Sequence, residues 1–182
     1  LDAVKAVGIL VVLLVHTGRS FGLVSFYGGM FYMPIFFITA GMTFSYKPEE
    51  SFGAFVKKKA KRLLLPYFGY NLFLFVFFFL RGNADGQTLL GILYSRNCLM
   101  PMGSATNVYF MQILNAPTWF LTCMFVSYIL FWILMRAAKG DSRKAFVGNG
   151  IYLLIAIGLH YACPVLLPWS IDCAFYAATF LI

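Results

Sequence analysis

Long apolar runs separated by short polar stretches dominate the pattern along the chain. The apolar runs cover residues 3–17, 28–46, 63–80, 119–135, 151–167 and 170–182. A helix rises about 1.5 Å per residue, so about 20 apolar residues cross the roughly 30 Å of hydrocarbon in a bilayer. The pattern therefore predicts an all-α, polytopic transmembrane helix bundle with about six spans.

The composition supports a membrane environment over a water-soluble core. Hydrophobic residues make up 62% of the 182 positions and charged residues 11%, with a mean hydropathy of +0.83. A soluble domain of this length could not bury so much apolar surface. We therefore expect the lipid bilayer to be the principal partner of the chain.

Lysine and arginine gather in two of the intervening loops. One loop holds Lys47, Lys57, Lys58, Lys59, Lys61 and Arg62, and the other holds Arg136, Lys139, Arg143 and Lys144. Basic loops stay on the cytoplasmic side during insertion. This predicts a multi-pass protein of the inner (plasma) membrane with a cytoplasmic amino terminus, and an outer stretch 81–117 that includes an interfacial or re-entrant piece. Topology also accounts for the net charge of +8, so no nucleic acid partner is expected.

Ionisable residues at membrane depth are the first candidates for chemistry. His16 follows Lys5 by three helical turns, which puts both side chains on one helix face about 16 Å apart. An imidazole is well suited to take a proton from a hydroxyl near neutral pH. The structural alternative is a histidine at the outer interface bonded to a nearby carbonyl, with Lys5 paired to Asp2 at the surface.

Asp172 is the second candidate and stands near the start of the last apolar run. Either Asp172 or Ser170 could cap that helix through its side chain. Alternatively, Asp172 orients a histidine or binds a polar acceptor.

The third candidate is the basic run that leads into the span at 63–80. Lys59 and Arg62 belong to it. They either anchor the span at the cytoplasmic surface or hold the phosphates of a ligand such as coenzyme A. No metal-ligand spacing is present, so no metal is expected.

Several stretches, taken in order, resemble one family. They are Leu1-Asp2-Ala3-Val4-Lys5 followed by His16-Thr17, residues 33–37 through Gly41, Leu65-Pro66-Tyr67, Trp119-Phe120-Leu121, and Leu167-Pro168-Trp169-Ser170-Ile171-Asp172. The chain resembles the acyltransferase-3 family of membrane O-acyltransferases, within it the branch similar to fucose 4-O-acetylase.

The resemblance implies one transmembrane acyltransferase domain over residues 1–182, an amino-terminal part truncated at the carboxyl end of a bundle of about ten helices. It implies transfer of an acyl group, usually acetyl, from cytoplasmic acetyl-CoA to a hydroxyl of a sugar or cell-envelope glycan. We assign catalysis to His16 and Asp172, and donor binding to Lys5, Lys59 and Arg62.

Two departures from the family pattern keep other functions open. Lys5 stands where the family has arginine and lacks its planar fork, and Ala40 stands where the family has serine. The alternatives are a proton-coupled transporter or flippase that uses His16 and Asp172 as a relay, or a catalytically inactive membrane scaffold. Binding of acyl-CoA distinguishes the enzyme from both.

Overall fold

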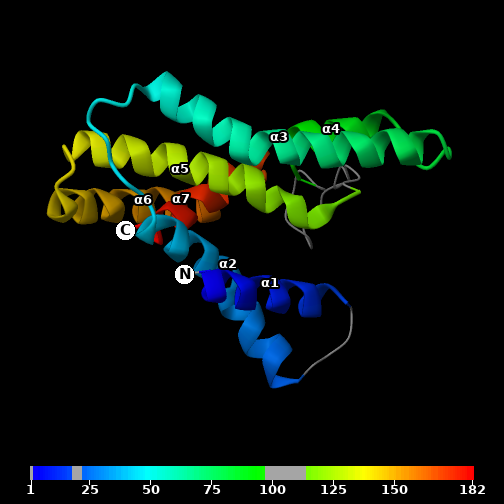
Figure 1. Cartoon of the computed structure of the whole chain (residues 1–182), viewed down its shortest axis with the longest axis horizontal. Coiled ribbons are helices and arrows are strands. Elements are labelled where there is room, and N and C mark those ends of the chain that lie inside the picture. Colours follow the sequence, from blue (N-terminus) through cyan, green and yellow to red (C-terminus); the bar gives the residue numbers. More distant parts are fainter. Residues whose placement is uncertain (1, 18–21, 97–113) are drawn as a thin grey trace.

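Helices form all the regular secondary structure of the residues that the computed structural model describes, namely 2–17, 22–96 and 114–182. They are α1 (Asp2–His16), α2 (Leu23–Met42), α3 (Phe52–Phe79), α4 (Gly86–Tyr94), the short 3-10 helix η1 (Ala116–Thr118), α5 (Trp119–Ala137), α6 (Ser142–Ala162), the 3-10 helix η2 (Pro168–Ser170) and α7 (Ile171–Thr179). Figure 1 shows their arrangement. The predicted all-α class is confirmed.

Three helices of the described part are long and apolar enough to cross a membrane. These are α3 with 28 residues, α5 with 19 and α6 with 21. At 1.5 Å per residue they measure about 42, 28 and 32 Å, against about 30 Å of hydrocarbon. Helix α1 is shorter at 15 residues, and α2 contributes a shorter apolar stretch at Phe31–Met42. The chain is therefore part of a helical membrane bundle.

The predicted bounds of two spans are wrong by several residues. Helix α3 begins at Phe52 instead of residue 63, so the basic run is itself helical, and the Ser51 hydroxyl caps it by accepting from the Ala54 N–H. An apolar run ends at the first charged residues, but the helix does not have to end there. Lysine and arginine are good helix formers, and their apolar stems let the charged groups reach water. Helix α6 begins at Ser142, after the Asp141 cap, and ends at Ala162 instead of residue 167.

Helix α5 lies at the centre of the bundle, with α3, α6 and α7 packed around it (Figure 1). Its closest neighbour is α7, whose contact face carries the buried small residues Ala174, Ala177 and Ala178. Small side chains allow two helix backbones to approach closely. The Ser127 hydroxyl accordingly donates across this contact to the carbonyl of Ala174, at 3.2 Å.

The α1–α2 hairpin reaches the rest of the bundle mainly through the carboxyl-terminal half of α2. Phe37 and Ala40 of this half are buried in the core cluster that includes Leu181. Gly41 lies so close that a Cβ there would collide with the backbone carbonyl of Leu181. The other half of α2, together with α1, diverges from the bundle in Figure 1.

Helix α4 folds back along α3 and does not span. The hydroxyl of the fully buried Tyr67 in α3 donates to the Ile92 carbonyl of α4, at 2.7 Å. Asp85 begins α4 through a capping box with Thr88, whose backbone N–H bond chiefly lowers the pKa of the Asp85 carboxyl. Within the stretch 81–117 the described residues include the short helix α4, and its interfacial or re-entrant placement stays a prediction. Residues 97–113 lie outside the described residues.

The two basic loops lie at the same end of the bundle. The guanidinium of Arg136, at the end of α5, donates to the Pro48 carbonyl in the loop before α3. The ring of Tyr46 in that loop lies against Gly140, in the loop before α6. Alternating spans require this arrangement, while the assignment of that end to the cytoplasm stays a prediction.

Candidate active site

His16 ends α1 with its two ring nitrogens in different roles. Nδ1 lies 2.8 Å from the Val12 carbonyl, one turn earlier in the helix. A carbonyl oxygen can only accept, so Nδ1 carries the proton, and Nε2 of the neutral imidazole is left with its lone pair. The structural alternative that the sequence allows, a histidine bonded to a nearby carbonyl, is therefore present. The same bond selects the tautomer whose Nε2 can accept a proton.

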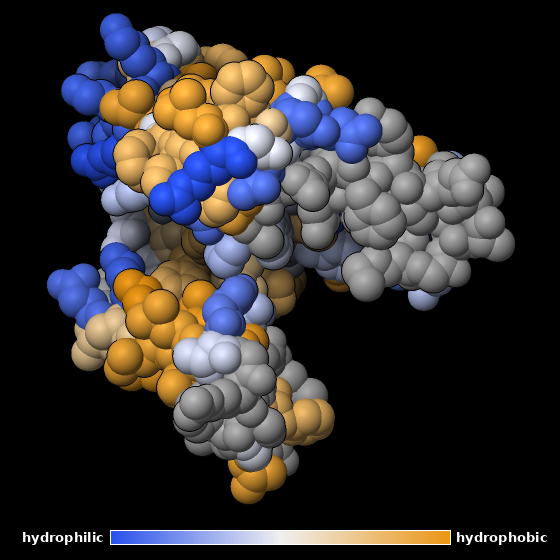
Figure 2. Space-filling view, turned by 90° about the vertical axis from the view of Figure 1, so that its right-hand side faces the viewer, coloured by the Kyte–Doolittle hydropathy of each residue, from blue (hydrophilic) through white to orange (hydrophobic). Residues whose placement is uncertain are grey.

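A cavity of about 300 Å³ lies beside His16. Its α1 wall consists of Ile9, Val12, Leu13 and His16, which recur at positions i, i+3, i+4 and i+7 and so share one helix face. The other walls come from α2 and the start of α5, with the lining residues Tyr32, Met33, Phe36, Pro117, Trp119 and Phe120. Figure 2 looks onto the molecule from the right-hand side of Figure 1 and shows the hollow between the α1–α2 hairpin below and the other helices above.

Gly8 and Phe36 fix the position of α1 over α2. A Cβ at Gly8 would lie 3.0 Å from the end of the Phe36 ring, so the glycine allows the two helices to pack closely there. On its other side the Phe36 ring lies 5.5 Å from that of Phe120, and Phe37 meets Phe120 edge-on at 5.2 Å. Such tilted aromatic pairs are the favoured geometry. They hold the floor of the cavity between α2 and α5.

Lys5 lies on the same continuous helix as His16, as the spacing predicts. Its ammonium is 3.9 Å from the carboxylate of Asp2, and both side chains are exposed to solvent or lipid. The predicted surface pair is therefore present. Within the described ranges, no hydrogen bond, ion pair or ring contact joins Lys5 to Lys59 or Arg62, the other residues that we assign to donor binding.

Lys59 and Arg62 lie one turn apart on α3. The Lys59 ammonium stands 3.2 Å from the ring centroid of Tyr128 in α5, with Phe55 at 5.5 Å. This cation–π contact holds the half-buried lysine against the bundle. The exposed Arg62 leaves its planar fork available to a phosphate from outside.

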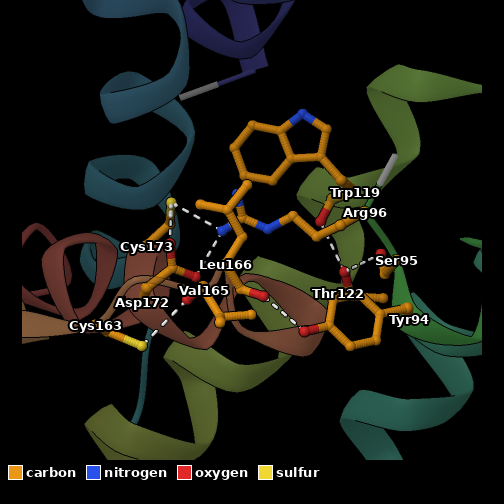
Figure 3. Close-up of polar contacts among 10 residues, drawn as sticks. All are labelled: Tyr94, Ser95, Arg96, Trp119, Thr122, Cys163, Val165, Leu166, Asp172 and Cys173. Atoms are coloured by element: carbon orange, nitrogen blue, oxygen red, sulfur yellow. Dashed lines mark hydrogen bonds and ion pairs between the residues drawn. The ribbon is translucent and has the colours of Figure 1, made fainter. Parts of the chain in front are cut away.

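Asp172 forms an ion pair with Arg96, a residue that the sequence-based assignment missed. The Arg96 guanidinium donates to the Asp172 carboxylate at 2.6 Å and to the Cys173 sulfur at 3.4 Å (Figure 3). The two side chains are 15% and 19% exposed. Asp172 thus contacts an arginine and not a histidine, and its catalytic role stays a prediction.

The sequence predicts that Ser170 or Asp172 could cap α7, but neither side chain does so. Ser170 occupies the cap position of α7 in a left-handed conformation, without a side-chain bond to the helix, and its buried hydroxyl has no hydrogen-bond partner among the described residues. Asp172 lies in the first turn, where a carboxylate interacts favourably with the helix dipole. One of its oxygens accepts from Arg96, and the other accepts from the Cys173 thiol at 3.7 Å.

Three contacts, one of them the ion pair described above, join the end of α4 to the segment around η2 and the start of α7. The Tyr94 hydroxyl donates to the Leu166 carbonyl at 2.6 Å, and the Trp169 indole N–H donates to the Leu93 carbonyl at 2.8 Å. We call these three contacts the α4–α7 clamp. A signal for it was available, because an arginine within an apolar outer stretch requires a partner.

The described ranges contain no group of three or more potential metal ligands.

The geometry defines a helical membrane protein with a histidine beside an apolar cavity. The family model described as an acyltransferase domain, that of acyltransferase-3, matches residues 1–182, and the chain belongs to this family. The protein is therefore a membrane acyltransferase. No curated protein and no solved structure matches the chain. Its place in the branch similar to fucose 4-O-acetylase stays a prediction.

Proposed function

We propose that this protein transfers an acyl group, acetyl in the first instance, from cytoplasmic acyl-CoA to a hydroxyl of a sugar or cell-envelope glycan. The observation that supports this most is the tautomer of His16. Its Nδ1–H is bound to the Val12 carbonyl, so a basic Nε2 remains beside an apolar cavity. The protein would lie in the plasma membrane with its amino terminus in the cytoplasm.

The donor would bind at the basic end of the bundle. Arg62 is exposed there, and the Tyr128 ring holds Lys59 one turn away on the same helix. Arginine forks and ammonium groups are the usual ligands of phosphate oxygens, which coenzyme A carries. Lys5 stands on the α1 face that carries His16 three turns further along, about 16 Å away. The pantetheine arm would extend inward from the basic end and bring the thioester to the imidazole.

The reaction then needs one proton carrier. His16 Nε2 takes the proton of the acceptor hydroxyl as its oxygen attacks the thioester carbonyl. The carbon–sulfur bond breaks, and the departing coenzyme A thiolate takes the proton from the imidazolium. The products are an ester of the acceptor and free coenzyme A. The Nδ1–H bond to the Val12 carbonyl holds the ring in one orientation during both proton transfers.

Asp172 would serve this reaction through Arg96. The ion pair links the end of α4 to the start of α7, and the cavity wall at Trp119 belongs to α5, which packs against α7. In this proposal Asp172 is a positioning residue that keeps the helices around the cavity in place.

The test is transfer of radiolabelled acetyl from acetyl-CoA to membrane glycoconjugates by the full-length protein and its His16→Ala variant. Loss of a general base lowers the rate by about 10² to 10⁴-fold. The chain holds two histidines, and the other, the exposed His160 at the end of α6, supplies the matched control. His160→Ala should keep the wild-type rate.

Transfer that survives in a correctly inserted His16→Ala protein would remove His16 from the mechanism. A folded wild-type protein that neither binds acyl-CoA nor incorporates label from any donor would refute the proposed function. Such a protein would be a transporter or a scaffold.

A further inference from the structure

The described lining of the cavity beside His16 offers almost no polar groups to a sugar. Among these residues the exposed lining surface is nearly all apolar, and the polar side-chain groups are the His16 imidazole, the Tyr32 hydroxyl and the Trp119 indole. A sugar, or the two amides of a pantetheine arm, would lose hydrogen bonds to water there without replacing them. A hydrocarbon chain loses nothing and gains from burial.

The cavity is also larger than an acetyl group requires. An apolar cavity of about 150 Å³ holds a six-carbon ring. The volume here is about 300 Å³. Along α1 the lining extends from His16 to Ile9, about 10 Å, which an unbranched chain of about seven carbons beyond the reacting carbonyl spans. An acetyl group has a single methyl carbon at that place.

We infer that this cavity is the acyl-chain site and that the enzyme accepts medium-chain acyl-CoA donors of up to about eight carbons. The inference rests on the proposed function and deepens it, because it names the class of donor. With the thioester carbonyl beside His16 Nε2, the chain lies along the face formed by Ile9, Val12 and Leu13 and ends at the Phe36 ring.

Phe36 sets the depth of this site. Its ring is held on one side by the backbone of α1 at Gly8 and on the other by Phe120, so the ring has little room to move aside. A chain that reaches the ring fills the cavity, and a longer chain must displace it. The kcat/KM for acyl-CoA should therefore rise with acyl chain length and then fall.

The experiment measures kcat/KM of the full-length protein in membranes with acetyl-, butanoyl-, octanoyl- and dodecanoyl-CoA. Each buried methylene contributes about 0.8 kcal/mol, which is up to about fourfold in kcat/KM per carbon until the cavity is full. Octanoyl-CoA should be preferred to acetyl-CoA by at least tenfold, and dodecanoyl-CoA should fall below octanoyl-CoA.

Leu10 and Leu13 supply a matched pair of variants. Both are leucines of α1 with 59% exposure, but Leu13 lines the cavity and Leu10 does not. Leu13→Trp should reduce the ratio of octanoyl to acetyl kcat/KM by at least tenfold, whereas Leu10→Trp should leave the ratio unchanged. A ratio does not depend on how much protein is folded.

A second variant should extend the preference to longer acyl chains. Phe36→Ala removes the ring that ends the cavity and should raise kcat/KM for dodecanoyl-CoA relative to octanoyl-CoA. The inference is overturned if the wild type uses acetyl-CoA but no longer chain, or if Leu13→Trp and Leu10→Trp have the same profile. Both results leave the proposed function intact. Absence of transfer from every donor refutes the proposed function itself, together with the inference.

Discussion

The Arg96–Asp172 pair should contribute strongly to stability, because it is shielded and short. The nitrogen and oxygen are 2.6 Å apart, and the side chains are 15% and 19% exposed. At an effective dielectric constant of about 20, the gross attraction is no more than about 6 kcal/mol, and desolvation of both ions offsets part of it. Removing one partner leaves the other charge unpaired, which costs about 3 kcal/mol at sites of this burial.

A double-mutant cycle measures this coupling. The free energy of unfolding is obtained from titration with a denaturing detergent in mixed micelles for Arg96→Ala, Asp172→Ala and the double variant. Each single variant should lose about 3 kcal/mol, and the double variant should lose clearly less than the sum, with a coupling of about 2 kcal/mol. The exposed Lys5–Asp2 pair, 3.9 Å apart, is the control and should show no measurable coupling.

Additive losses at Arg96 and Asp172 would refute the reasoning, because independent sites add within about 0.5 kcal/mol. A further cycle separates the positioning role from direct catalysis. If Asp172 acts on His16 directly, Asp172→Ala and His16→Ala will be strongly non-additive in kcat/KM while Arg96→Ala is mild. If Asp172 acts through Arg96, then Arg96→Ala and Asp172→Ala will have equal effects on kcat/KM.

Two other substitutions test how the helices meet. Gly41→Ala places a Cβ against the backbone carbonyl of Leu181, which cannot rotate away, so the variant should lose about 1–3 kcal/mol or more of stability in the same detergent titration. Ala at the exposed Gly69, where no atom lies within 4 Å, should be neutral or gain up to about 1 kcal/mol. Tyr67→Phe removes the donor to the Ile92 carbonyl and should cost about 1–2 kcal/mol, with faster hydrogen exchange confined to α4. Unchanged exchange in α4 would show that this bond does not hold the helix.

Local patterns predicted much of the fold. Apolar runs of sufficient length identify the helices, and the spacing of Lys5 and His16 places both on one continuous helix. The ends of α3 and α6 could not be read in this way, because charged residues extend a helix as well as apolar ones do. Their true starts are marked by Ser51 and Asp141, the residues that cap them.

The partners of the candidate residues were beyond such patterns. Asp172 and Arg96 are 76 positions apart, and nothing local to either indicates the other. Likewise, the Tyr128 ring that holds Lys59 comes from a different helix. Sequence could establish that charges at membrane depth require partners. Only the tertiary contacts identify them: the residues after α4 meet the first turn of α7, and α3 packs against α5.

The strained backbone at Trp169 and Ser170 shows how the α4–α7 clamp relates to the cavity. Both residues have positive φ, of 54° and 55°, which non-glycine residues adopt only when surrounding contacts impose it. The clamp supplies those contacts at the end of α4, where Ser95 also bonds the Thr122 hydroxyl at 2.7 Å. Thr122 in turn donates to the carbonyl of Trp119, in the first turn of α5.

That first turn carries the Trp119 and Phe120 side chains that wall the cavity beside His16. The stretch 167–172, which resembles the family, therefore influences the candidate active site indirectly. It holds the end of α4, and the end of α4 holds the start of α5. Loosening the clamp should accordingly disturb the acyl-chain preference before it disturbs the proton transfer, since His16 keeps its own bond to Val12 within α1.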